Sequence, residues 1–423
     1  MSQNENSMRP YFDRSPLPER LLAMMAMKVE LPPSKHVLAV ERYEAVRKHI
    51  ERPDSPLNGK VACFYPQGSM AIRATIRSRK RDDGYDIDIV AELILPAGTP
   101  PGVVLDLLYE AINGPKGSRY HGMTERQTRC VTVHYADGMH LDVTASILQD
   151  ENDPRRSWIF HAKPEEPSSK HTRKVMNSFA FCKCFNDGAP VDTDFATAYR
   201  DLVLARDIVI KADAEVHPVP EHSTEEGGKS VKVVALQLLK RNRNVGYQRR
   251  PKLRMPPSVL LSGLTSELDL VGTGLLQALD AVSGHVLSAL EDAERKGELI
   301  DFCNPVCSED SFTDRWPENR QAQQLYISDL QKFRRQLAEL ASGHLSLEKM
   351  KELMADMFGE QPTSSVMDDY NEELGRMVRE GRREHDKTGR VRPVAAEAAA
   401  ISAPSIARPH TFYGGRLDRH EDD

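Results

Sequence analysis

The chain has 423 residues and a formal net charge of -6, with 57 Lys and Arg against 63 Asp and Glu. This acidic balance argues against a protein whose main role is to coat nucleic acid, although it is compatible with a local basic pocket. The length predicts two domains with tails, and an apolar content of 39% predicts that part of the chain lies outside a packed core.

The sequence disfavours a membrane location and a zinc site. No run approaches the roughly 20 apolar residues that span a bilayer, and the polar start MSQNENSMRPYF lacks the apolar core of a signal peptide. We therefore expect a cytoplasmic protein without a membrane partner. The six cysteines are scattered without a CxxC pair, and this spacing favours free thiols.

The first part of the chain is expected to be a lead-in followed by a helix. Residues 1–33 are polar and rich in proline, and they contain one short apolar patch, LLAMMAM, that could form a small helix. From Ser34 apolar residues recur at spacings of three and four, which predicts an amphipathic helix that ends at Arg52-Pro53.

Residues 34–165 are predicted to form an α+β core with a mixed sheet. In chain order, VACFY indicates a strand, GSMAIRATI a turn entering a helix, YDIDIVAEL a strand and VVLDLLYEAI a helix. The segment CVTVHYADGMHLDVTAS then indicates a hairpin that turns at Asp137-Gly138. Strands and helices in this order are typical of a mixed α/β layer.

Residues 166–360 are predicted to form a helical domain. The expected helices are 171–185, 195–214, 229–243, 258–263, 271–294, 319–342 and 346–358. Residues 361–423 are expected to be a C-terminal extension that is largely disordered from about residue 380, because high charge, alanine and proline replace any long periodic face there.

Three aspartates are the strongest candidates for chemistry. Side chains alternate along a strand, so Asp86 and Asp88 share one face while Ile87 and Ile89 share the other. The same alternation gives Asp142 the polar face of its own strand. Carboxylate oxygens suit Mg²⁺, and two such ions can serve nucleotidyl transfer. The alternative is the solvated edge of an ordinary sheet, which a lone DxD motif would favour.

The Gly68-Ser69 turn favours a nucleotide and metal site over the solvated edge of a sheet. A turn between a strand and a helix offers free backbone amides and a hydroxyl at a helix N-terminus, which suits phosphate. Ser69 alone could be a plain helix cap. The order of strand, Gly-Ser turn, DxD strand and third aspartate on a hairpin is more specific than any of its parts.

The predicted helix over 229–243 carries a basic stripe formed by Lys229, Lys232, Lys240 and Arg243. Such a stripe is commonly a solvated face. The alternative is that a lysine, Lys240 before the others, contacts phosphate across a cleft from the aspartates. Ser258 could cap the next helix or offer its hydroxyl to a triphosphate.

Together these segments resemble a known family. YPQGSMAIRATI, GYDIDIVAEL and HLDVTAS, followed by KVVALQLLKRNRN, PPSVLLSGL and NPVCSEDSFTDRW, resemble the bacterial cyclic-oligonucleotide synthases of anti-phage signalling, which are relatives of cyclic GMP–AMP synthase and oligoadenylate synthase. The resemblance runs from about residue 35 to about residue 358. It implies a polymerase-β-like nucleotidyltransferase core followed by an oligoadenylate-synthase-like helical domain.

The resemblance also implies roles for individual residues. Asp86, Asp88 and Asp142 would bind two Mg²⁺ ions, with Mn²⁺ as an alternative. The residues implied to bind the nucleotide are Gln67, Gly68, Ser69, Lys240 and Ser258. Residues 304–316 would have a structural role.

The implied substrates are nucleoside triphosphates, ATP among them, joined into a cyclic di- or trinucleotide. An ancillary regulatory protein that acts on the enzyme or its C-terminal tail is an expected partner. No Cys/His cluster matches the zinc insertion of DNA-sensing relatives, so no stable nucleic-acid partner is expected.

Two other functions remain open at the level of sequence. The same fold could make a linear product, as an oligoadenylate synthase or an RNA-tailing enzyme does. A non-catalytic binding module is the third reading, and it is disfavoured because all three aspartates and the Gly-Ser turn are present.

Overall fold

The computed structural model describes residue 12 and residues 15–77, 84–150, 153, 155–212, 228–381, 383–385 and 391–393. Residues Met1–Val366 form one compact unit and Met367–Asp423 form a second. In the second unit, β10 (Arg383–His385) and β11 (Val391–Pro393) pair antiparallel. The tail beyond them, for which we predict disorder, lies outside the described residues.

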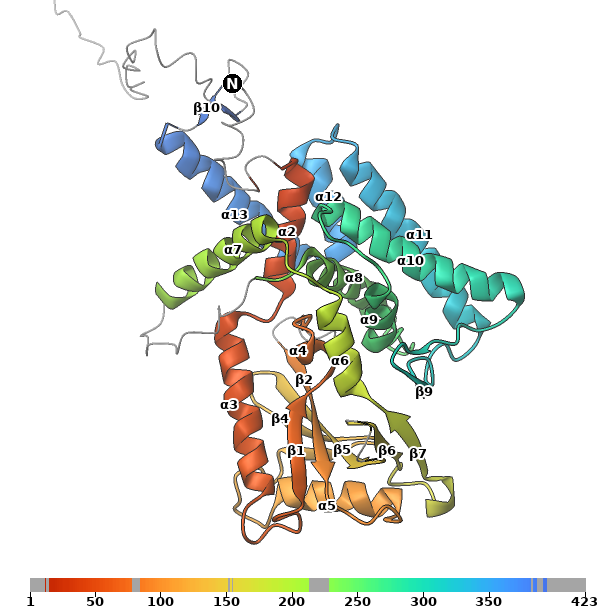
Figure 1. The fold of residues 1–423 in the computed structure, drawn as a ribbon. Coiled ribbons are helices and arrows are strands. Elements are labelled where there is room, and N and C mark those ends of the chain that lie inside the picture. Colours follow the sequence, from red (N-terminus) through yellow and green to blue (C-terminus); the bar gives the residue numbers. More distant parts are fainter. Residues whose placement is uncertain are drawn as a thin grey trace, which may run out of the picture. The chain divides into compact units, whose positions relative to one another are not determined.

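The first unit contains a seven-stranded sheet (Figure 1). Its strands are β1 (Val61–Pro66), β2 (Tyr85–Leu93), β3 (Thr124–Arg126), β4 (Val131–His134), β5 (Met139–Leu148), β6 (Ser157–His161) and β7 (Thr172–Met176). The strand order is β1-β2-β5-β4-β3, with β6 paired to β5 and β7 to β6. Strands β2 and β5 are parallel and the other pairs are antiparallel, which confirms the predicted mixed sheet.

The predicted hairpin is present as β4 and β5. Gly138 occupies the turn with φ of 85°, a left-handed conformation that glycine adopts without steric cost. The turn sets the register, in which Thr132 lies opposite Asp142. Side chains then alternate along β5, so Leu141 and Val143 face the core while Asp142 faces away.

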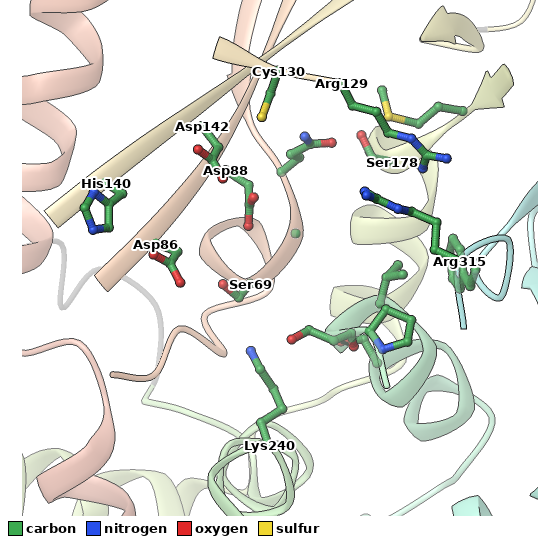
Figure 2. A pocket seen from close by; sticks show the side chains of 18 of the residues that line it. Ser69, Asp86, Asp88, Arg129, Cys130, His140, Asp142, Ser178, Lys240 and Arg315 are labelled. Atoms are coloured by element: carbon green, nitrogen blue, oxygen red, sulfur yellow. Dashed lines mark hydrogen bonds between the residues drawn. The ribbon is translucent and has the colours of Figure 1, made fainter. Parts of the chain in front are cut away.

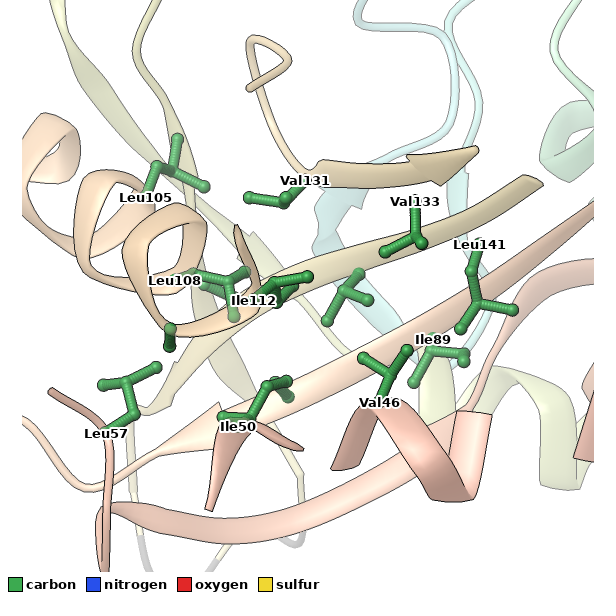
Figure 3. Close-up of a cluster of buried hydrophobic side chains, with 14 of the residues drawn as sticks. Val46, Ile50, Leu57, Ile89, Leu105, Leu108, Ile112, Val131, Val133 and Leu141 are labelled. Carbon is green, nitrogen blue, oxygen red and sulfur yellow. The ribbon is translucent and has the colours of Figure 1, made fainter. Parts of the chain in front are cut away.

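One face of the sheet is buried under two helices, α3 (Pro33–Ile50) and α5 (Pro101–Asn113) (Figure 3). From α3, Val46 and Ile50 enter this core, and α5 contributes Leu105, Leu108 and Ile112. Because Ile87 and Ile89 of β2 point into the same core, Asp86 and Asp88 must face the opposite side of the sheet.

The other helices of the first unit are α2 (Leu17–Val29), α4 (Gly68–Ala71), α6 (Ser178–Asp187), α7 (Thr193–Ala212), α8 (Val231–Gln248), α9 (Ser258–Ser266), α10 (Leu275–Lys296), α11 (Arg320–Ala341) and α12 (Leu347–Phe358). Helix α13 (Glu360–Arg379) spans the boundary between the two units. A 3₁₀ turn, η2 (Ser168–Lys170), precedes β7, and β8 (Cys303–Asn304) pairs with β9 (Cys307–Ser311). Helix α8 contacts α2, α9, α10, α11 and α12 and is the centre of the helical layer.

Several sequence predictions need correction or completion. The first part of the predicted helix 171–185 is strand β7, because pairing with β6 stabilises an extended TRKVM segment. Helix α6 begins only at Ser178, where the Asn177 side chain accepts a hydrogen bond from the Ala180 amide. The helix expected in GSMAIRATI is the single turn Gly68–Ala71.

Two further observations concern membrane-spanning helices and the cysteines. No helix among the described residues combines the length and apolarity needed to cross a bilayer. All six cysteines are free thiols, as predicted. The predicted domain boundary at residues 165 and 166 stays a prediction, because both sides of it belong to the unit Met1–Val366.

The predicted lead-in contains an integral helix. Helix α2 is buried along most of its length and packs against α8 and α10. Helix α10 begins after Gly274, which has no side chain to cap it, and Glu19 of α2 takes that role. The Glu19 carboxylate accepts hydrogen bonds from the amides of Leu275 and Leu276, the latter at 2.9 Å. A carboxylate at a helix N-terminus is stabilised by the helix dipole.

Replacing Glu19 with alanine should therefore destabilise the helical layer. One buried and one partly buried amide would lose their acceptor, which costs about 1–3 kcal/mol of unfolding free energy. The measurement is urea unfolding followed by circular dichroism. Glu41→Ala, on the exposed face of α3, is the matched control and should leave the midpoint unchanged. Equal midpoints for both variants would show that the Glu19 cap does not stabilise the helical layer.

Candidate active site

A cavity of about 810 Å³ lies between the polar face of the sheet and helices α6, α8 and α9 (Figure 2). It is lined by every residue that we predicted from the sequence for the site. These are Gln67, Gly68, Ser69, Asp86, Asp88, Asp142, Lys240 and Ser258. The structure therefore brings the candidates together, while their roles in binding and catalysis remain predictions.

The three carboxylates lie on two neighbouring strands. In the parallel pairing of β2 and β5, Asp88 lies opposite Asp142 and Asp86 lies opposite His140. Paired strands are about 4.8 Å apart, so the side chains of Asp88 and Asp142 are neighbours on one face. The Thr132 hydroxyl donates to Oδ1 of Asp142 at 2.5 Å and fixes that carboxylate.

Burial and mutual repulsion dominate the electrostatics of this cluster. Burial, together with the charges of Asp142 and Asp86, raises the pKa of the Asp88 carboxyl to about 7, and the charge of Lys240 opposes this shift. Burial also raises the pKa of Asp142, while its hydrogen bond from Thr132 opposes that shift. A cation near these carboxylates would relieve the repulsion and favour their ionised forms.

Hard oxygen donors on one face suit divalent cations such as Mg²⁺. Among the described residues, no three His, Cys, Asp or Glu side chains are close enough together to form a ready-made ligand set. The carboxylates fit a cation by their chemistry and their shared face. They would have to move closer together to hold it.

Gly68 is required by the geometry of the turn. Its φ is 54°, and a β-carbon at this position would lie 3.1 Å from Oδ2 of Asp88. The backbone of the turn can therefore approach the carboxylate cluster only because residue 68 lacks a side chain. The Gln67 amide donates to the Asp88 carbonyl at 2.9 Å, which fixes the turn to strand β2.

Ser69 and Gln67 are held by short-range contacts. The Ser69 carbonyl accepts from the Ala74 amide at 2.8 Å, and its hydroxyl lies 3.4 Å from the Thr75 hydroxyl. The Gln67 side-chain amide donates to the Thr144 hydroxyl at 3.2 Å. Because α4 is a single turn, phosphate binding here would depend on individual N–H groups and the Ser69 hydroxyl more than on a helix dipole.

The basic stripe on α8 is not a solvated face. Lys232, Lys240 and Arg243 are each only 3% exposed. Lys229 forms an ion pair with the buried Glu30, and Lys232 donates to the Gly188 carbonyl. Helix α8 is covered on nearly all sides, so these cations are anchored by internal acceptors and not by water.

Lys240 and Ser258 reach the cavity from the helical side. The Lys240 ammonium donates to the Ala74 carbonyl at 2.7 Å, and burial, reinforced by the Arg243 charge, lowers the pKa of Lys240 to about 7. Ser258 accepts from both terminal nitrogens of Arg243 at 3.1 and 3.2 Å. Lys240 thus connects α8 to the segment that follows the Gly-Ser turn.

Sequence reasoning missed several cavity residues. Thr132 could have been found, because a hairpin turning at Asp137-Gly138 pairs residue 132 with residue 142. Arg129 and Arg315 face the cavity from its far side, and no local pattern marks them (Figure 2). Arg315 lies in the segment 304–316, for which a structural role is expected. That expectation suits Asn304, which is buried and donates to Asp310 at 2.9 Å.

Comparisons with known proteins agree with this geometry. Residues 21–158 match the family described as the Second Messenger Oligonucleotide or Dinucleotide Synthetase domain. The cyclic dinucleotide synthase CdnG of Bradyrhizobium diazoefficiens is 39% identical over 402 residues, which are 94% of this chain and 95% of that protein. The c-di-GMP synthase of Roseivirga ehrenbergii is 22% identical over 407 residues, covering 94% of this chain and 97% of that protein.

Solved structures extend the comparison to the fold. The structure of B. diazoefficiens CdnG in complex with GTP superposes with a TM-score of 0.74 at 37% identity, covering 84% of this chain and 98% of that one. The E. coli CdnC:HORMA-deltaN complex gives a TM-score of 0.53 at 16% identity, covering 81% and 96%, which shows a shared fold. From its identity to CdnG over nearly its whole length, the chain belongs to the bacterial cyclic-oligonucleotide synthases, a family of nucleotidyltransferases.

Proposed function

We propose that this protein joins two nucleoside triphosphates into a cyclic dinucleotide and releases pyrophosphate. The observation that carries the proposal is the convergence of Asp86, Asp88 and Asp142 with the Gly68-Ser69 turn in one cavity. GTP is the favoured substrate, because one relative is named a c-di-GMP synthase and another was solved with GTP. The expectation that ATP is also used stays a prediction.

The residues of the cavity divide the chemistry between them. The Gly68-Ser69 turn binds the triphosphate through amides and a hydroxyl, and Lys240 approaches from the opposite side. A ribose hydroxyl of one nucleotide attacks the α-phosphorus of the other, and Asp142, oriented by Thr132, accepts the hydroxyl proton. The bond to the pyrophosphate oxygen breaks, and a second transfer of the same kind closes the ring.

Divalent cations complete this proposal. Two Mg²⁺ ions, or Mn²⁺, held by Asp86, Asp88 and Asp142 would supply charge stabilisation at the α-phosphate and the leaving pyrophosphate. The carboxylates provide hard oxygen ligands, and their mutual repulsion is the reason that cations would stabilise the site.

We propose the cellular role from the family to which the chain belongs. A second messenger made in the cytoplasm during anti-phage defence fits the family, and an ancillary protein could regulate the enzyme, since CdnC was solved in complex with HORMA-deltaN. No direct contact with nucleic acid or membrane is needed for the proposed activity.

Incubation with all four nucleoside triphosphates and Mg²⁺ should give a phosphatase-resistant product. Its mass should be that of a cyclic dinucleotide containing guanine. High-resolution mass spectrometry after phosphatase treatment is the measurement. A ladder of phosphatase-sensitive linear oligonucleotides would favour the linear transferase instead.

Replacing Asp86 and Asp88 together with asparagine should lower product formation by about a thousandfold, since metal-assisted charge stabilisation contributes several kcal/mol to such a transfer. Initial rates of pyrophosphate release measure the effect. Asp137→Asn is the matched control: Asp137 lies at the hairpin turn, pairs with Lys35 and Arg42, and does not line the cavity. Wild-type rates in the double variant would refute the assignment of the carboxylates.

A further inference from the structure

Among the described residues, one cation of the cavity wall has no partner in the protein and no role in the proposed chemistry. Five Lys and Arg side chains line the cavity: Arg77, Arg129, Lys240, Arg243 and Arg315. The first four have partners in the protein. Within the described residues, the Arg315 guanidinium forms no hydrogen bond or ion pair, and Figure 2 shows it directed into the cavity.

The backbone around Arg315 is held on both sides. Before it, Asp314 accepts from Arg129 at 2.5 Å and from Lys174 at 2.9 Å, which ties this segment to the sheet. After it, Trp316 is 1% exposed and packs edge-on against Tyr326, with the two ring centroids 5.8 Å apart. The Arg315 carbonyl itself accepts from Arg254 at 3.0 Å. A fixed backbone with an available side chain is the arrangement that a preorganised ligand contact requires.

The cavity offers aromatic surface for a base, in addition to the charges of Arg129 and Arg254 that act on the Arg315 guanidinium. Phe312, three residues earlier, packs edge-on against Phe181 with ring centroids 5.0 Å apart, and both rings line the cavity. The groups proposed to bind triphosphate, at Gly68-Ser69 and Lys240, lie elsewhere on the cavity wall. A planar guanidinium in a cavity that is also lined by aromatic rings can recognise the edge of a flat heterocycle.

Guanine and adenine differ at the edge that an arginine can read. Guanine presents two acceptors, O6 and N7, to which a guanidinium can donate two parallel hydrogen bonds. Adenine presents N7 as an acceptor but carries an amino donor at position 6, which opposes an arginine. An arginine without another partner therefore selects guanine.

We propose that Arg315 is a specificity-determining residue that donates to O6 and N7 of a guanine base bound in the cavity. This proposal rests on the proposed synthesis of a cyclic dinucleotide from GTP. It assigns base choice to the segment that follows β9, which reaches the cavity from the helical side.

The test changes the arginine side chain in the full-length enzyme and, separately, single atoms of the base in the substrate. Steady-state kcat/KM is measured for wild type and Arg315→Gln with GTP, 7-deaza-GTP, inosine triphosphate and ATP. Wild type should lose about 10-fold with 7-deaza-GTP, which lacks the N7 acceptor, and should use inosine triphosphate, which keeps O6 and N7, nearly as well as GTP. Arg315→Gln should lose about 10- to 100-fold with GTP and show no further loss with 7-deaza-GTP.

Two further variants keep the result interpretable. Arg320→Gln, at the start of α11 and outside the cavity, should behave as wild type with every substrate. Arg315→Lys retains the positive charge but offers no planar fork, so its preference for GTP over 7-deaza-GTP should fall even if the glutamine variant does not fold.

The outcomes separate this inference from the proposed function. Equal losses with all four substrates would show that Arg315 holds a phosphate, and unchanged discrimination would show that it touches no base; either result overturns the inference. Failure of the wild-type enzyme to form a cyclic product from any triphosphate would instead contradict the proposed function.

Discussion

The site depends on one unfavourable interaction, the repulsion among carboxylates held on the same face of two parallel strands. The register of β2 and β5 places Asp88 opposite Asp142. Both carboxylates must point away from the hydrophobic core, because Ile87 and Leu141 fill the core on the opposite face of the sheet. The fold stabilises this arrangement with apolar burial on one side of the sheet. The cost on the other side is visible in the raised pKa of Asp88, and it becomes useful only when a cation or a charged substrate arrives.

Helix α8 supplies positive charge opposite the aspartates, and this charge is shielded from solvent. Lys232, Lys240 and Arg243 of α8 are buried and donate to carbonyls and to the Ser258 hydroxyl. Lys240 and Gln237 donate to the carbonyls of Ala74 and Thr75, so the chain that leaves the Gly-Ser turn is connected directly to the centre of the helical layer. A change in the position of α8 would therefore move the Gly68-Ser69 turn, which we propose to bind phosphate, relative to the aspartates. This coupling gives a physical route by which events in the helical layer could affect activity.

The sequence predicted the parts of the site that depend on interactions between residues close together in the chain. Alternation along a strand placed Asp86 and Asp88 on one face, and the Asp137-Gly138 turn gave the hairpin that carries Asp142. Strand β7 was missed because a five-residue extended segment is stabilised by its partner β6, which the sequence does not reveal. The burial of the α8 lysines was missed because helical periodicity defines a face but not what covers it. Arg315 was missed because its place opposite the aspartates depends on ion pairs between distant segments.

The central claim is that the three aspartates repel one another in the free protein and bind divalent cations. Thermal unfolding of wild type, Asp88→Asn and Asp137→Asn, each with and without Mn²⁺ at pH 8, tests it most directly. The account predicts that Asp88→Asn is at least as stable as wild type without Mn²⁺, because a repulsive charge is removed. It also predicts that Mn²⁺ at a hundred times its dissociation constant stabilises wild type and Asp137→Asn by about 2.7 kcal/mol and leaves Asp88→Asn unchanged. An Asp88→Asn protein that is less stable without cation and is stabilised by Mn²⁺ as much as wild type would contradict the account.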